Sequence, residues 1–166
     1  MKIKLYHHTH EHLLPAILND GYVELECHNL ERAAKCRLSK HERGASNSML
    51  WRSIKRQMKY TGRYVWLTEE KKVLCLDDPV PTARILFYAE DIGATRWPEV
   101  RNRLSKKGRK LARVNDDIAK SKGDDVSKWW VVDRKIPMSR ARKFTDITGQ
   151  RSWISCYEEN LLRGEG

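Results

Sequence analysis

The sequence lacks three features that would assign it to common protein classes. No apolar run approaches the roughly 20 residues that cross a bilayer, so we expect no membrane partner. The N-terminus runs from Met1 directly into polar histidines, without the apolar stretch of a signal peptide, and we therefore expect a cytoplasmic protein. No CxxC pair is present, and in that compartment we expect reduced thiols at Cys27, Cys36, Cys75 and Cys156.

Positive charge, in contrast, is abundant. The 166 residues include 33 Lys and Arg against 22 Asp and Glu, a net charge of +11. Such a charge favours a polyanionic partner, and nucleic acid is favoured over a membrane surface. A generally basic surface without a specific partner is the alternative interpretation, and a target protein stays open as another partner.

Two stretches with helical spacing, about 27–60 and 97–122, concentrate this charge. Between Asn29 and Lys59, nine Lys or Arg residues face two acids. Runs of this kind contact phosphates in nucleic-acid-binding proteins, and they also occur as solvated helix faces. The residues that we expect to contact nucleic acid are Arg52, Lys55, Arg56, Lys59, Arg103, Lys106, Lys107, Arg109 and Lys110.

Strand-like and helix-like segments follow each other without regular βαβ alternation, which predicts an α+β fold in a single domain, 1–166. The first helix is expected after an N-cap at Thr9, with Pro15 near its start and Gly21 as its stop. The expected strands are 2–6, 64–68, 84–89 and 129–136, followed by two in 141–148 and 152–160.

Four histidines, His7, His8, His10 and His12, fall within six positions. If the helix begins early enough, His8 and His12 share one face at the i, i+4 spacing of metal ligands. A third ligand from Glu11, Cys27 or His28 would then suit a metal-dependent nuclease or phosphotransferase. Because no complete HExxH motif is present, we favour imidazoles that bond backbone or ligand at a turn, and we assign no metal site.

The opening Tyr6-His7-His8-Thr9-His10, followed by Leu14-Pro15-Ala16-Ile17-Leu18 and Gly21, resembles the start of ADP-ribosyltransferase-like proteins. The spacing is most similar to the DarT type, which modifies DNA bases with NAD, and more loosely similar to the tRNA 2′-phosphotransferases. The resemblance implies a split β-sheet core with basic helical insertions. It also implies an NAD-dependent transferase that acts on or near nucleic acid, as a toxin or phage effector.

The same resemblance implies roles for individual residues. His7 would bond the ribose of NAD and take part in catalysis, and Thr9 would help to hold the dinucleotide. The stretch "YVWLTEE" resembles the second motif of the superfamily, in which an aromatic residue packs on nicotinamide, and its matching positions are Tyr64, Trp66 and Thr68. A basic binding module without enzymatic activity is the alternative function for the same fold.

The third motif of the superfamily is a glutamate on a late strand. Breaking the glycosidic bond of NAD leaves positive charge on the ribose, so a carboxylate near C1′ stabilises the transition state. The segment "SWISCYEEN" offers Glu158 for this role, with Glu159 beside it, and "FYAED" offers Glu90 as a rival.

Overall fold

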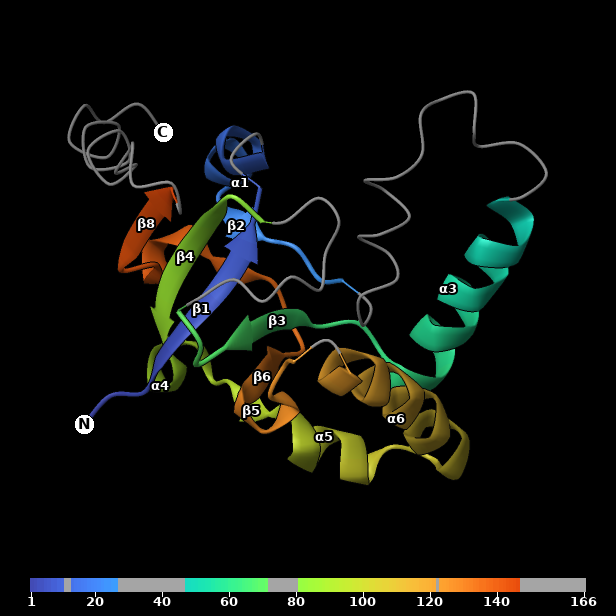
Figure 1. The fold of residues 1–166 in the computed structure, drawn as a ribbon. Coiled ribbons are helices and arrows are strands. Elements are labelled where there is room, and N and C mark those ends of the chain that lie inside the picture. The colour runs from blue at the N-terminus through green and yellow to red at the C-terminus, as the bar shows by residue number, and fades with distance from the viewer. Residues whose placement is uncertain (11–12, 27–46, 72–80, 122, 147–166) are drawn as a thin grey trace.

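The computed structural model describes residues 1–10, 13–26, 47–71, 81–121 and 123–146, which form an α+β fold (Figure 1). The strands are β1 (Lys4–Thr9), β2 (Tyr22–Val23), β3 (Val65–Thr68), β4 (Ala83–Tyr88), β5 (Thr95–Arg96), β6 (Trp129–Val132), β7 (Ile136–Pro137) and β8 (Lys143–Asp146). The helices are α1 (Leu14–Asp20), α3 (Asn47–Thr61), α4 (Ala89–Ile92), α5 (Trp97–Arg103) and α6 (Lys106–Ser121), with short 3-10 turns η2 (Val126–Lys128) and η3 (Met138–Arg140).

Six strands form one sheet in the order β5-β6-β3-β1-β4-β8, with antiparallel pairing between neighbours. The strand that carries His7 and His8, β1, therefore lies in the middle, between β3 and β4. A second sheet contains only β2 and β7. None of the helices in the described part of the chain has the length and apolar character of a membrane span.

Side chains alternate between the two faces of the six-stranded sheet along each strand. On the first face, Leu5 pairs with Phe87 and Val65 pairs with Val132, and all four side chains are buried. Leu14 of α1 completes this largely aliphatic core. Because successive residues of a strand point to opposite faces, the residues between them form a separate surface.

The second face is built around tryptophans. Trp66 of β3 pairs with Val131 of β6, and Trp129 continues the same face at the next alternate position of β6. Trp97 of α5 and Ala112 of α6 pack against this face and are fully buried. The sheet consequently separates two cores, one aliphatic and one aromatic.

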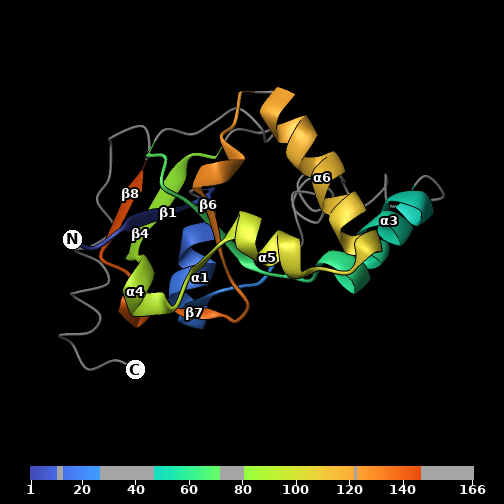
Figure 2. The ribbon, with the colours of Figure 1, turned by 90° about the horizontal axis from the view of Figure 1, so that it is seen from below.

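Helices α3 and α6, far apart in the sequence, lie side by side at the end of the molecule away from β8 (Figures 1 and 2). The two helices approach closely at Gly108, where an added Cβ would lie 2.3 Å from the carbonyl oxygen of Tyr60. Only glycine permits this contact without a shift of one helix backbone. The contact joins α3 and α6, each of which belongs to one of the two predicted basic stretches.

The first strand is longer than the sequence predicted. It runs from Lys4 to Thr9 instead of ending at Tyr6, so the prediction of Thr9 as an N-cap is wrong. The helix begins at Leu14, and Pro15 lies in its first turn, where the missing N–H removes no helical hydrogen bond. Gly21 ends the helix with φ of 78°, as the sequence predicted.

Two other predicted segments are each divided in the structure. The expected strand 129–136 forms β6 and β7, which belong to different sheets, because the exposed residues Asp133, Arg134 and Lys135 turn the chain between them. The stretch from Trp97 onward forms α5 and α6, interrupted at Leu104 by extended backbone. The expected strands 64–68, 84–89 and 141–148 correspond to β3, β4 and β8.

Several predictions fall on residues outside the described ranges. These are the basic residues of 27–46, the strand expected in 152–160, Glu11, His12, His28, the four cysteines, Glu158 and Glu159.

Candidate functional site

His7 lies in the middle of β1 with its side chain on the aliphatic face, and only 7% of the residue is exposed. Its Nδ1 lies 2.9 Å from the carbonyl oxygen of Trp66 on the neighbouring strand β3. A carbonyl oxygen only accepts hydrogen bonds, so Nδ1 carries the proton and donates it. In the neutral ring, Nε2 is then the nitrogen that accepts. The fold thus selects one tautomer of His7.

Thr9 shares the aliphatic face with His7, two positions further along β1. It pairs with Ala83 of β4 and is 3% exposed. His10 follows the strand, is also buried, and its carbonyl oxygen accepts a hydrogen bond of 2.9 Å from the N–H of Leu13. The buried polar residues His7, Thr9 and His10 therefore follow the chain from the middle of β1 toward α1.

The Trp66 side chain lies on the aromatic face, opposite His7. Its ring contacts Trp97 and Trp129 at centroid distances of 4.7 and 5.9 Å, at steep angles. Its indole N–H donates to the carbonyl oxygen of Glu26 at 3.1 Å. The structure therefore brings the backbone of Trp66 to His7 and directs the Trp66 ring into the second core.

Thr68 also belongs to the aromatic face, where it pairs with Tyr6 of β1 and Trp129 of β6. Its Oγ1 accepts a hydrogen bond of 3.1 Å from the N–H of Glu70. The predicted NAD-binding residues are thus divided by the sheet. His7 and Thr9 lie on one side, and Trp66 and Thr68 lie on the other.

His8 is the neighbour of His7 on β1 and points to the opposite face. Its Nε2 lies 3.0 Å from the carbonyl oxygen of Glu70, and its ring lies alongside that of Tyr6. Because His8 is in a strand, the helical i, i+4 pairing with position 12 that the metal hypothesis required does not form. No cluster of three or more His, Cys, Asp or Glu residues suitable for a metal occurs in the described ranges.

The glutamate candidates differ in their distance from His7. Glu90 is the second residue of α4, and its Oε1 accepts a hydrogen bond of 3.3 Å from the N–H of Ile3. Ile3 and His7 are four positions apart in extended chain, roughly 13 Å at the usual rise of a strand. Glu90 therefore lies at the opposite end of β1 from Thr9. Glu158 and Glu159 are outside the described residues.

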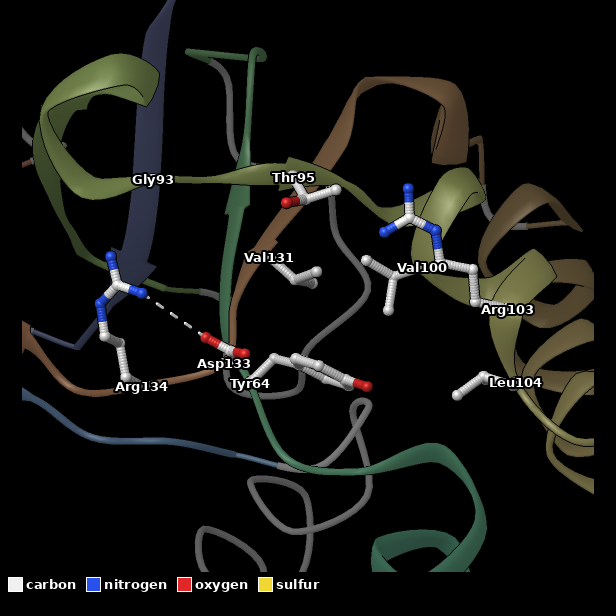
Figure 3. A pocket seen from close by; sticks show the side chains of 9 residues that line it. All are labelled: Tyr64, Gly93, Thr95, Val100, Arg103, Leu104, Val131, Asp133 and Arg134. Carbon is white, nitrogen blue, oxygen red and sulfur yellow. Dashed lines mark ion pairs between the residues drawn. The ribbon is translucent and has the colours of Figure 1, made fainter.

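Tyr64 lines an open cavity of about 450 Å³ between the sheet and α5 (Figure 3). Burial raises the pKa of Tyr64, and the nearby Asp133 carboxylate adds to this effect, so the phenol stays neutral at physiological pH. Arg103 and Arg134 lie at opposite sides of the lining in the close view. The complete lining is Tyr64, Gly93, Thr95, Val100, Arg103, Leu104, Val131, Asp133 and Arg134.

Sequence reasoning identified Tyr64 and Arg103 but missed the other residues of this cavity. Asp133 and Arg134 interrupt an apolar run, and that interruption was the one available signal that the chain turns there. Nothing in the sequence pointed to Gly93 and Thr95, because the pairing of β5 with β6 is what brings this segment close to Val131 and the residues that follow it.

The exposed basic residues of α3 and α6 meet where the two helices touch. Lys107 Nζ donates to the Tyr60 hydroxyl at 3.0 Å and lies 4.2 Å from the centre of its ring. Lys59 lies 5.4 Å from the same ring. The hydrogen bond from Lys107 lowers the pKa of Tyr60, and the charges of Lys107, Lys59 and Arg56 act in the same direction.

Most of the predicted nucleic-acid contacts are exposed in the structure. They are Arg52, Lys55, Arg56 and Lys59 on α3, Arg103 on α5, and Lys106, Lys107 and Lys110 on α6. We use the name basic ridge for the seven of these residues that lie on α3 and α6.

Arg109 is different, because it is half-buried and its guanidinium has a structural role. Its Nη1 donates to the carbonyl oxygen of Leu104 at 2.7 Å, and a longer contact of 3.5 Å reaches that of Asn102. It thereby satisfies carbonyl groups at the end of α5. Contact of Arg109 with nucleic acid stays a prediction.

A buried carboxylate, Asp116 of α6, connects α6 to α5. It is 1% exposed, accepts a hydrogen bond of 2.9 Å from the indole N–H of Trp97, and pairs with Arg101. Sequence patterns did not identify it, since Asp116 and Asp117 are adjacent acids and only the helix orientation distinguishes the buried one.

No protein-family model matches this sequence, and neither a curated protein nor a solved structure matches it.

Proposed function

We propose that this chain is an ADP-ribosyltransferase-like protein that binds NAD and acts on or near nucleic acid. The observation that carries the proposal is the pairing of β1 with β3, joined by the hydrogen bond from His7 to the carbonyl of Trp66. The two segments that resemble the first and second motifs of the superfamily, more than fifty residues apart, are neighbouring strands. The split β-sheet core belongs to the same proposal.

In this proposal, His7 and Thr9 contact the ribose and the dinucleotide. The Nδ1 proton is held by the Trp66 carbonyl, so Nε2 is the atom that would accept a ribose hydroxyl. Trp66 then acts through its backbone as a positioning residue, since its ring packs in the aromatic core. His7 is only 7% exposed, so NAD has to open the surface above it.

Glu158 is the proposed catalytic carboxylate, which stabilises the positive ribose as nicotinamide leaves. The end of β8 supports this assignment: Asp146 pairs with Ala83, which pairs in turn with Thr9. Two strand spacings separate Asp146 from Thr9, roughly 10 Å. Twelve further residues reach up to roughly 40 Å when extended, which is sufficient for Glu158 to approach His7. Glu90 lies at the other end of β1.

The test is release of nicotinamide from NAD in the presence of DNA or RNA. We expect His7→Ala and Glu158→Gln to reduce the rate by about 100-fold, the usual size for loss of one group that stabilises the transition state. His8→Ala and Glu90→Gln are the matched controls and should retain the parent rate. A His7→Ala protein as active as the parent would contradict the site.

A second candidate function, a nucleic-acid-binding module without catalysis, is favoured by the basic ridge. Lys59 and Lys107 meet around Tyr60, so two charged helices present one surface. A phosphate backbone on such a surface releases counterions, and its affinity falls steeply with salt. This function predicts salt-dependent binding of oligonucleotides together with no thermal shift on addition of NAD. A thermal shift with NAD that is lost in His7→Ala would instead favour the transferase.

A further inference from the structure

The cavity beside Tyr64 has the size and lining of a site for a nucleobase. Its volume of about 450 Å³ lies within the usual range for small-ligand pockets. Val100, Leu104 and Val131 supply apolar walls. Tyr64 supplies an aromatic ring, and its neighbours Trp66 and Trp97 meet it at 84° and 63°, so neither lies parallel on its face. A flat ligand that also carries polar groups suits this space, because Thr95, Arg103, Asp133 and Arg134 belong to the same lining.

The polar groups of the cavity suit a nucleotide. Arg103 and Arg134 stand on opposite sides of the lining, as Figure 3 shows, where each can reach a phosphate. Arg134 is held over Gly93, since its Nη2 donates to the carbonyl oxygen of Ile92 at 3.3 Å and a Cβ at Gly93 would lie 2.9 Å from that nitrogen. The Asp133 carboxylate pairs with Nη1 of Arg134 at 3.8 Å, and its remaining lone pairs can accept hydrogen bonds from the N–H groups of a base.

The position of the cavity connects it with the basic ridge. Tyr64 follows the end of α3 by three residues, and Arg103 and Leu104 precede the first residues of α6. The junction at Lys59, Tyr60 and Lys107 is thus adjacent in the chain to both of these cavity walls. A single-stranded nucleic acid bound to the basic ridge would pass the cavity. Its phosphates would lie on the lysines, and one of its bases would lie beside Tyr64.

We propose that this cavity receives one unpaired base of a single-stranded nucleic acid whose phosphates lie on the basic ridge. The inference rests on the nucleic-acid part of the proposed function and does not depend on NAD, because the cavity opens on the face of the sheet opposite His7 and Thr9. Bases bound in this way are held by stacking on an aromatic ring, which tolerates several sequences. The Asp133 carboxylate favours bases that carry an amino group.

The test compares two labelled hexamers of equal charge, one of deoxycytidine and one with abasic sites at all six positions, by fluorescence anisotropy without NAD. The parent protein should bind the deoxycytidine hexamer about tenfold more tightly, the usual effect of stacking one base. Val100→Trp, which fills the cavity, should remove this difference and leave the affinity for the abasic hexamer unchanged. Thr95→Phe fills the cavity from β5 and replaces Val100→Trp if that variant does not fold.

Variants of the basic ridge distinguish binding of a base in the cavity from general binding of the phosphate backbone. The double variant Lys59→Ala, Lys107→Ala should weaken both hexamers by the same factor, whereas the matched control Arg140→Ala, an exposed arginine outside the cavity and the ridge, should weaken neither. Equal binding of the two hexamers by the parent protein would overturn the base site and leave nucleic-acid binding intact. Failure of both hexamers to bind would overturn both.

Discussion

The two faces of the six-stranded sheet are built with different chemistry. The face that carries His7 is closed mainly by aliphatic and phenylalanine side chains, such as Leu5 and Phe87, with one tryptophan, Trp130. The face that carries Trp66 is closed by tryptophans, and a buried carboxylate, Asp116, holds the indole of Trp97. The stability of the first core depends mainly on close packing of apolar side chains. The stability of the second core depends in addition on hydrogen bonds to its buried indole N–H groups. Substitutions on the two faces should therefore destabilise the protein for different reasons: loss of packing on one face and loss of a polar partner on the other.

The largest effect is expected on the aliphatic face. Phe87→Ala removes a fully buried ring and should lower the free energy of unfolding by about 4 kcal/mol, measured by urea denaturation. Leu86→Ala on the same strand is the control, since its half-buried side chain points to the other face and should cost much less. Equal losses for the two variants would show that the faces of β4 are not distinct.

A smaller loss is expected at the carboxylate of the aromatic face. Asp116→Ala leaves the Trp97 N–H and the Arg101 guanidinium without their partner, which should cost about 3 kcal/mol by urea denaturation. We expect the lower end of the usual range, because the Arg101 side chain is itself 20% exposed. The exposed neighbour Asp117→Ala should change stability little, and a loss as large as that of Asp116→Ala would contradict the assignment.

The smallest expected effect is the pH dependence of stability that comes from Asp124, on the aromatic face near Trp129. Burial raises the pKa of Asp124, and a hydrogen bond from Trp129 opposes this shift. A carboxyl whose folded-state pKa is raised contributes stability below its unfolded pKa and loses it as the pH rises through the folded value. Asp124→Asn should therefore gain stability relative to the parent as the pH rises from 4 to 7.

Thermal midpoints of unfolding across that pH range test this expectation, with Asp117→Asn as the control. A difference between Asp124→Asn and the parent that does not change with pH would show that the carboxyl is not desolvated in the folded protein.

The sequence predicted local structure better than it predicted the site. Alternating apolar residues indicated β3 and β4 closely, and Gly21 indicated the end of α1. The extension of β1 through Thr9 was missed because pairing with β4 stabilises it, and pairing is not visible in a local pattern. The division of 129–136 between two sheets was missed for the same reason.

Functional residues were predicted as a group from two motifs, yet strand geometry separates them. Trp66 and His7 are joined through the backbone of Trp66, and their side chains lie on opposite faces. Arg109 was predicted to contact nucleic acid because its charge lies in a basic run, and only the structure shows that its Nη1 bonds the carbonyl group of Leu104 after α5. Charge is a property of the sequence, whereas the direction of a side chain depends on helix phase and packing.

By itself, the sequence determined the positive charge, the α+β character and the end of α1 at Gly21, because these follow from composition and from contacts between near neighbours in the chain. Only the tertiary structure decided which side of the sheet each candidate faces, that α3 and α6 form one basic ridge, and that a cavity lies beside Tyr64. Each of these depends on contacts between segments tens of residues apart. A shift of one residue in strand register would move every side chain of that strand to the other face of the sheet.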